Sequence, residues 1–273
     1  MKSHIIIFSL FFFSCNLEKE IEISLPPYSS LPFVECYIEQ GLPLRLLLTK
    51  SSSFFSNFTL EDPELLQSWL YQNAAVSIAF NGEKYRLLNI PFFDTETGKF
   101  YNYFSPIIPD SSYKGQYLLE IVLPSGEELS AETYHLDLVK IDSVVIQFNV
   151  DSQARALTYF TDPIEEENYY RRVLHKNNLS GEPLQSFTTD DRLVNGNFVF
   201  GSGYEFSQGD TVFNTLYHID RSYFNFLESI QRAVDGNGNP FAQPSPIQSN
   251  IKGKANGIFT FISKDQTSII VKK

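Results

Sequence analysis

Apolar and polar residues alternate in short runs along most of this chain. In Val34–Ile38 and Leu44–Thr49 every second residue is apolar, so one face of each run is expected to be buried. Further runs flank Asn81-Gly82-Glu83 and Pro124-Ser125-Gly126-Glu127, which are turn sequences and predict two β-hairpins. A period of two repeated in this way predicts a chain built mainly from β-strands.

The spacing of these runs predicts two consecutive domains. About seven short strands are expected within residues 32–138, a pattern that resembles an immunoglobulin-like β-sandwich closing near Leu138. Residues 139–273 are expected to form a second antiparallel β domain, which begins with the alternating run Lys140–Val150. The predicted fold class is therefore all-β.

One segment of the second domain has helical spacing instead. Apolar residues recur every three or four positions over residues 221–234, which predicts a helix. Either Asp220 or Ser222 is suited to cap its first turn. Further on, Gly257–Ile262 and Thr267–Val271 are predicted to form a closing hairpin.

Residues 1–14 have the layout of a secretory signal peptide. Lys2 precedes a run from Ile5 to Phe13 that is apolar except for Ser9. As a helix this run would be roughly 14 Å long, too short to span the hydrocarbon core of a bilayer. Ser14 and Cys15 follow directly, as in a bacterial lipobox, so Cys15 is the predicted lipidation site and the first residue of the mature protein.

The lipobox match is loose, and a second interpretation stays open. Only Ser14 fits the strict pattern, because Phe12 and Phe13 stand where Leu and a small residue are usual. An ordinary signal peptide cut near Ser14 would leave Cys15 free to pair with Cys36. No A-x-A-like site occurs nearby, which favours lipidation. Residues 15–31 are then a lipidated tether, stiffened by two consecutive prolines.

Composition and charge limit the partners. Aromatic residues make up 15% of the chain and the formal net charge is -11. An acidic surface repels phosphate backbones, so no nucleic-acid partner is expected. Attachment to the outer membrane would then depend on acyl chains on Cys15, two or three of which hold firmly. Cys36 is expected to be a small buried core residue.

No catalytic constellation, cofactor or metal site is predicted. The four histidines lack metal-ligand spacing. The Asp235–Asn239 turn has only the first half of a calcium-loop pattern, which leaves calcium binding there an open question. Glu165-Glu166-Glu167 and Asp190-Asp191 are interpreted as solvated turns. An enzyme would need Asp190 and Asp191 to converge with a Glu or His in a cleft.

The aromatic run Phe100–Phe104 allows two interpretations. Tyr101 and Tyr103 would suit stacking against sugar rings or a peptide if they were exposed. In a chain with 25 Phe and 15 Tyr, packing in the core is the favoured interpretation.

Several short stretches, in this order, resemble one known family. They are Ile23-Ser24-Leu25-Pro26, Leu31–Ile38, Leu46–Ser51, Gly115–Ile121, Leu129–Thr133, Asn168–Arg171, Asp190-Asp191 with Asn195-Gly196, Asn239-Pro240-Phe241, Ser249–Gly253 and Gly257-Ile258-Phe259. The chain resembles domain-of-unknown-function family 4249, lipoproteins of Gram-negative bacteria of the Bacteroidota type. Cys36 departs from the Gly or Ala expected there, and Lys254-Ala255-Asn256 interrupts the lead into Gly257.

The resemblance implies an outer-membrane, surface-facing lipoprotein without an established activity. It also implies a frequent association with a TonB-dependent receptor of the SusC kind. The expected function is therefore that of a non-enzymatic accessory to such a receptor or to another outer-membrane assembly. A glycan- or peptide-binding module that uses exposed aromatic side chains is the alternative.

Overall fold

The computed structural model describes residues 30–51, 67–95, 98–194, 196–236 and 246–273, and it confirms the all-β fold class. Its strands form one eleven-stranded and one three-stranded sheet. The elements in chain order are β1 (Pro32–Glu39), β2 (Leu44–Lys50), β3 (Ala75–Phe80), β4 (Glu83–Asp94), β5 (Lys99–Ser105), β6 (Gln116–Val122), β7 (Glu128–Tyr134), β8 (Ile141–Phe148), β9 (Ala154–Thr161), β10 (Tyr169–Lys176), β11 (Gln185–Asp190), β12 (Asn197–Gly201), β13 (Thr211–Ile219), α2 (Arg221–Gly236) and β14 (Asn256–Ile270).

The N-terminal half forms a β-sandwich because β4 bends from one layer into the other. Residues 83–87 of this strand pair with β3 and residues 88–94 pair with β5, and a bulge between Asn89 and Phe92 bends the second part. The β1-β2-β5 layer therefore faces the β3-β6-β7 layer. Both predicted hairpins are confirmed, as β3–β4 and β6–β7.

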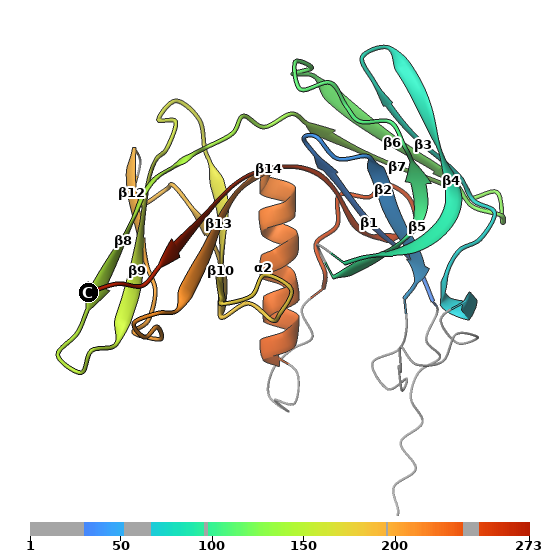
Figure 1. The fold of residues 1–273 in the computed structure, drawn as a ribbon. Helices are drawn as coiled ribbons and strands as arrows, with labels where there is room; N and C mark the ends of the chain where they lie inside the picture. Colours follow the sequence, from blue (N-terminus) through green and yellow to red (C-terminus); the bar gives the residue numbers. More distant parts are fainter. Residues whose placement is uncertain (1–29, 52–66, 96–97, 195, 237–245) are drawn as a thin grey trace, which may run out of the picture.

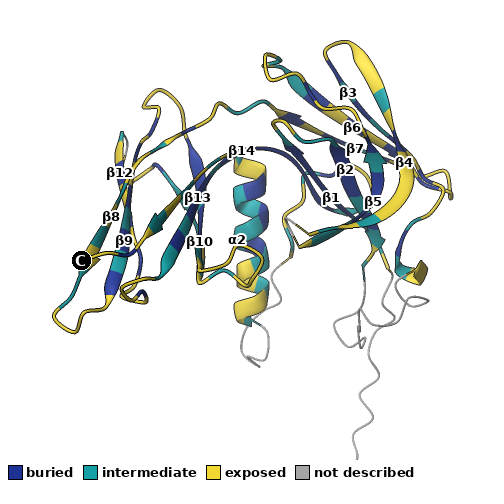
Figure 2. Cartoon of the chain, in the orientation of Figure 1, coloured by how far each residue is buried: buried dark blue, intermediate teal, exposed yellow. Residues whose placement is uncertain are grey.

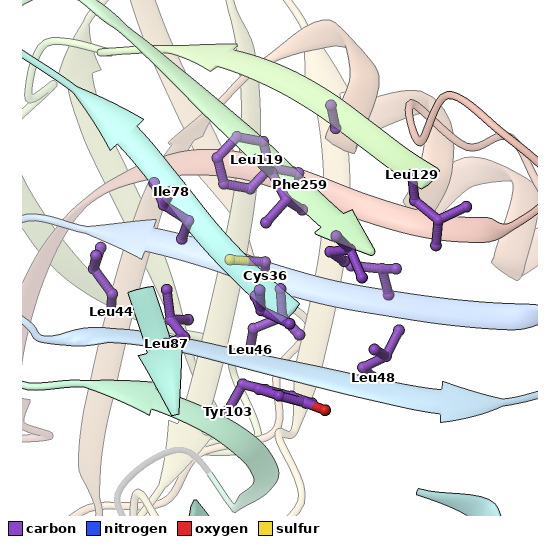
Figure 3. Packing of buried hydrophobic residues seen from close by; sticks show 14 of the residues in the cluster. Cys36, Leu44, Leu46, Leu48, Ile78, Leu87, Tyr103, Leu119, Leu129 and Phe259 are labelled. Atoms are coloured by element: carbon purple, nitrogen blue, oxygen red, sulfur yellow. The ribbon is translucent and has the colours of Figure 1, made fainter. Parts of the chain in front are cut away.

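The core of this sandwich follows from the predicted alternation. Every second residue of β1 and β2 faces the opposite layer and is buried, and Figure 3 shows these side chains from both layers together. The labelled members are Cys36, Leu44, Leu46, Leu48, Ile78, Leu87, Tyr103, Leu119, Leu129 and Phe259. The buried position predicted for Cys36 is confirmed, since its side chain is fully enclosed.

The C-terminal half forms a second sandwich. Its larger layer has the strand order β11-β10-β13-β14, and the three-stranded sheet β12-β9-β8 covers it. Two apolar clusters fill the space between the layers, one around Phe160 and one around Phe206.

The predicted closing hairpin at the C-terminus is wrong, because β14 is one continuous strand. Residues 256–262 pair in parallel with β1, and residues 262–270 pair antiparallel with β13. The residues expected to turn are paired with β13 instead, and Lys264 Nζ lies 2.9 Å from Glu39 Oε2. The N-terminal sandwich is thus completed by a strand from outside the predicted range of residues 32–138.

The predicted helix is confirmed as α2, which extends to Gly236. It lies in the angle between the two sandwiches, beneath the arch of β14 (Figure 1). Its buried face packs Tyr223 and Phe226 against Tyr37 of β1 and Ile258 of β14. Figure 2 shows buried and half-buried residues along the middle of the helix and exposed residues at its two ends. The helix therefore contacts strands that belong to both sandwiches.

Candidate functional site

Two candidate positions lie outside the described residues. Cys15, the predicted lipidation site, precedes residue 30, and the Asp235–Asn239 turn is described only to Gly236. Lipidation therefore stays a prediction, and calcium binding stays an open question.

The exposed-aromatic interpretation of Tyr101 and Tyr103 is wrong, because both rings are buried. Tyr103 faces the core of the N-terminal sandwich, where its hydroxyl donates to the Tyr71 carbonyl at 3.0 Å. Tyr101 lies beneath the Arg45 guanidinium, 5.0 Å from ring centroid to Cζ. Both rings are buried because β5 is an inner strand of its sheet, between β2 and β4.

The interpretation of Asp190-Asp191 as a solvated turn is wrong, because Asp190 ends strand β11 and Asp191 is buried. Arg192 Nε donates to Asp190 Oδ2 at 2.8 Å at the surface, whereas Asp191 is buried. The backbone amide of Asn168 donates to Asp191 Oδ2 at 2.8 Å. Glu165, Glu166 and Glu167 are exposed, as predicted for a solvated turn.

The side chain of Asn168 joins Asp191 to a buried histidine. Its Nδ2 donates to the Pro163 carbonyl at 2.7 Å, which leaves Oδ1 facing His218 Nε2 at 3.1 Å. The other ring nitrogen of His218 lies 2.8 Å from the Asp137 carbonyl. Residues of the Asn168–Arg171 and Asp190-Asp191 stretches, far apart in sequence, thus meet in one network.

The network also contains a second buried carboxylate. The Tyr170 hydroxyl donates to Asp162, and the Tyr170 ring stacks on His218 with centroids 5.4 Å apart. Burial raises the pKa of Asp162 and lowers the pKa of His218. Because these groups are enclosed and bonded to protein atoms, the arrangement is suited to hold the turns at one end of the second sandwich.

A second charged cluster, which the sequence analysis did not find, lies on strands β1, β2 and β4 of the N-terminal sandwich. Arg45 forms ion pairs with Glu39 at 2.9 Å and with Asp94 at 2.6 Å, and all three side chains are nearly buried. Glu39 also pairs with Lys264 of β14. These contacts join β1, β2 and β4 to the shared strand. Only the alternation of Arg45 with inward-facing leucines signalled that it points away from the core.

Large apolar side chains are exposed on the outer part of β4. Leu88, Ile90 and Phe93 are 53%, 45% and 59% exposed. Figure 2 shows this strand light on the outside of the N-terminal sandwich. Three such residues on one strand are the kind of surface that contacts another macromolecule. We call these three residues the β4 patch.

An open depression of about 710 Å³ lies between β8 and the end of β14. Its lining is Ile146, Thr211, Ser268, Ile269, Ile270 and Lys272, a set without a carboxylate or histidine. This lining offers no acid and base pair for catalysis.

Neither a membrane-crossing helix nor a metal-binding group is found in the part of the chain that the structure describes. There, no helix has the length and apolar character needed to cross a bilayer. Among those same residues, no three His, Cys, Asp or Glu side chains are arranged to hold a metal ion.

Comparison with known proteins gives one extensive match. A family model described as "Domain of unknown function (DUF4249)" matches residues 18–268. No curated protein matches the sequence.

Two solved structures show only weak likeness, and each is longer than the stretch it shares with this chain. A DUF4785 family protein from Legionella pneumophila has 11% identity and a TM-score of 0.25, over 68% of this chain and 52% of that one. The FN1-FN3 domains of chicken CNTN1 have 11% identity and a TM-score of 0.28, over 89% of this chain and 66% of that one. TM-scores this low support no inference about this chain.

Proposed function

The chain belongs to the DUF4249 family, and on that premise we propose that it is a non-enzymatic, surface-exposed lipoprotein of the outer membrane. In this proposal it acts as an accessory of a TonB-dependent, SusC-like receptor or another outer-membrane assembly. The observation that carries the proposal is Cys15, directly after a short apolar run and ahead of the folded body. The 15 residues from Asn16 to Ser30 can span at most about 50 Å.

The position of Cys36 supports lipidation of Cys15 over a disulfide between the two cysteines. Cys36 is fully enclosed in the N-terminal sandwich, where its thiol donates to the Arg45 carbonyl at 3.4 Å. Burial raises the pKa of this thiol far above its usual range, which suppresses the thiolate needed for disulfide exchange. A pairing with Cys15 would require the core to open.

The two cysteines provide a matched test of the anchor. Expression with an alkyne-tagged fatty acid should label the chain, Cys15→Ser should lose the label and leave the membrane fraction, and Cys36→Ala should retain both. An unlabelled wild-type chain, or release of the wild type into the medium, would refute the anchor.

The β4 patch is suited to contact the receptor, because the buried centre of a protein interface is apolar and enriched in aromatic side chains such as that of Phe93. Cross-linked, detergent-solubilised outer membranes should yield the chain together with a β-barrel protein. Leu88→Ser, Ile90→Ser and Phe93→Ser combined should reduce that yield by about tenfold or more.

A matched control replaces three exposed apolar residues of the other sandwich, Val145, Tyr159 and Val199, with Ser. This control variant should recover the barrel as the wild type does. Failure of the wild-type chain to recover any β-barrel would contradict the receptor partnership while leaving the anchor intact.

A further inference from the structure

One side of the C-terminal sandwich is incompletely closed. β14 pairs with β1 only as far as Ile262, and among the described residues no strand pairs with residues 263–270 on the side away from β13. In the other layer β8 is the edge strand and pairs only with β9. The backbone amide of Ile141 on β8 donates to Asp265 Oδ2 at 2.8 Å. Two unpaired strand edges, one from each layer, therefore lie next to each other.

The core side chains between these two edges are only partly covered. Val212 and Leu216 of β13, one strand further in, are fully buried. Ile269 of β14 and three apolar residues of β8 belong to the same core but are half-buried. The residues of β8 are Val144, Ile146 and Phe148. They border the open depression of about 710 Å³, which leaves room for the side chains of one more strand.

An unpaired edge beside an apolar depression is suited to bind an extended peptide. The backbone of the peptide pairs with the edge, and every second side chain enters the depression. The charges at the end of β14 add a second requirement. Lys272 lines the depression, and Lys273 Nζ lies 5.6 Å from the ring centroid of Phe148. Acidic residues at the alternate, outward-facing positions of the peptide would complement these two cations.

The chain itself contains a segment with this pattern. In Glu20–Leu25 every second residue is Ile or Leu, and the residues between them are Glu, Glu and Ser. Pro26 follows, and because proline has no amide hydrogen it suits the end of such a strand. Residues 20–25 equal residues 265–270 of β14 in number. The segment precedes the described residues, and the family match, which begins at residue 18, includes it.

The segment of the same chain is poorly placed to reach the depression. Leu25 is eight residues from Phe33, which allows a span of at most about 29 Å. Phe33 pairs with Asn256, and β14 continues from there for twelve residues, about 40 Å of strand, to Ser268. The helix α2 also lies between the start of β1 and this end of β14 (Figure 1). The segment of a second copy is free of this restriction.

We propose that residues 20–25 of a second copy of this chain add to the edge of β14 at residues 265–270. Ile21, Ile23 and Leu25 enter the depression, and the two glutamates lie on the outer face, where the lysines after Ile270 complement their charge. Mutual exchange of the segment between two copies closes the pair as a dimer. The pairing leaves Cys15 available for lipid and does not depend on the receptor partnership.

Engineered cysteines test the pairing in the cell envelope. Two differently tagged full-length chains are co-expressed, one with Ser24→Cys and the other with Ser268→Cys, at an exposed position of β14. Both positions lie on the outer face of the added strand pair, so a disulfide should join the two tags. Glu22→Cys tests the adjacent register, since a disulfide needs Cα atoms within about 7 Å. Ser125→Cys, at an exposed turn of the other sandwich, replaces Ser268→Cys as the control and should give no link.

Two outcomes of this experiment would overturn the proposal. The first is the absence of a dimer that carries both tags, with Ser24→Cys and with Glu22→Cys alike. The second is a disulfide that forms only within a chain carrying both cysteines, because the segment would then lie in the depression of its own chain.

Co-purification of the two tagged copies from detergent-solubilised membranes tests the apolar contacts. Ile23→Asp should reduce recovery of the second copy by about tenfold or more, because it places a charge in the depression. Ser24→Asp introduces the same residue one position along, on the outer face, and should retain recovery. Neither position belongs to the described cores, so both variants should fold. Equal recovery of the wild type and of Ile23→Asp would refute the pairing.

Discussion

A missing side chain determines how closely β14 approaches β1. Gly257 has a φ of 131°, a backbone conformation that residues other than glycine rarely adopt. A Cβ atom at this position would lie 1.9 Å from the Val34 carbonyl oxygen. The parallel pairing that completes the N-terminal sandwich therefore requires glycine here.

Gly257→Ala is expected to destabilise the protein by about 3 kcal/mol or more, because it adds both backbone strain and a clash with main-chain atoms. Urea unfolding measures the change. Gly181→Ala, in open space and without a positive φ, is the control and should change stability little. A small effect of Gly257→Ala would mean that β1 and β14 separate more easily than their pairing indicates.

Arg45 is a nearly buried cation that pairs with two nearly buried carboxylates. Replacing it leaves Glu39 and Asp94 as nearly buried carboxylates without the guanidinium between them. Arg45→Met should therefore cost about 3–5 kcal/mol in the free energy of unfolding. Lys84→Met breaks the exposed pair with Glu120 and should cost less than about 1 kcal/mol. Similar losses in the two variants would contradict a buried role for Arg45.

At the scale of elements, α2 and β14 hold the two sandwiches together through Asp220. The backbone amide of Tyr223 donates to Asp220 Oδ1 at 2.7 Å, which caps the helix as predicted. The hydroxyls of Thr133 on β7 and Thr260 on β14 donate to the other oxygen at 3.0 and 2.9 Å. One carboxylate thus joins the helix start to two strands.

Asp220→Ala should lower the free energy of unfolding by about 2 kcal/mol, since it removes the cap and the acceptor of the buried Thr133 hydroxyl, whereas Thr260 can still donate to the Phe261 carbonyl. Chemical denaturation followed by far-UV and aromatic signals measures the loss. Ser222→Ala, at an exposed position of the first turn, should have little effect. If Ser222→Ala lost as much stability as Asp220→Ala, the assignment of the cap to Asp220 would be wrong.

At the scale of the whole molecule, the histidines determine the response to mild acid. Burial is the main cause that lowers the pKa of each of His135, His175 and His218. In the unfolded chain these side chains bind protons below about pH 6.5. The unfolded state therefore binds more protons than the native state there, and stability falls as the pH falls.

Each fully neutral histidine should contribute up to about 1.4 kcal/mol of lost stability per pH unit below about 6.5. Unfolding free energies at about pH 7.5 and about pH 5.5 measure this slope. His218→Gln should reduce it. Burial raises the pKa of Asp162 and of Asp220, so these two groups favour the native state as the pH falls. The test is therefore the difference in slope between the wild type and His218→Gln. An unchanged slope would show that His218 is protonated in the native state.

The sequence by itself determined the features that depend on neighbours along the chain. Alternation in β1 and β2 placed Cys36 and the leucines in a core, turn residues predicted both hairpins, and helical spacing predicted α2. The short apolar run before Cys15 predicted the anchor, which stays a prediction.

Only the tertiary structure decided the features that depend on contacts across the fold. The sequence of residues 263–266 predicts a turn, but in the fold these residues pair with β13. The single strand β14 therefore follows from long-range pairing. Tyr101 and Tyr103 become buried only because β2 and β4 flank β5. Asn168, Asp191 and His218 meet because β10 lies between β11 and β13 in one sheet. The alternation of apolar and polar residues along a strand shows which face of the sheet a side chain lies on. Only the fold determines which other residues it contacts on that face.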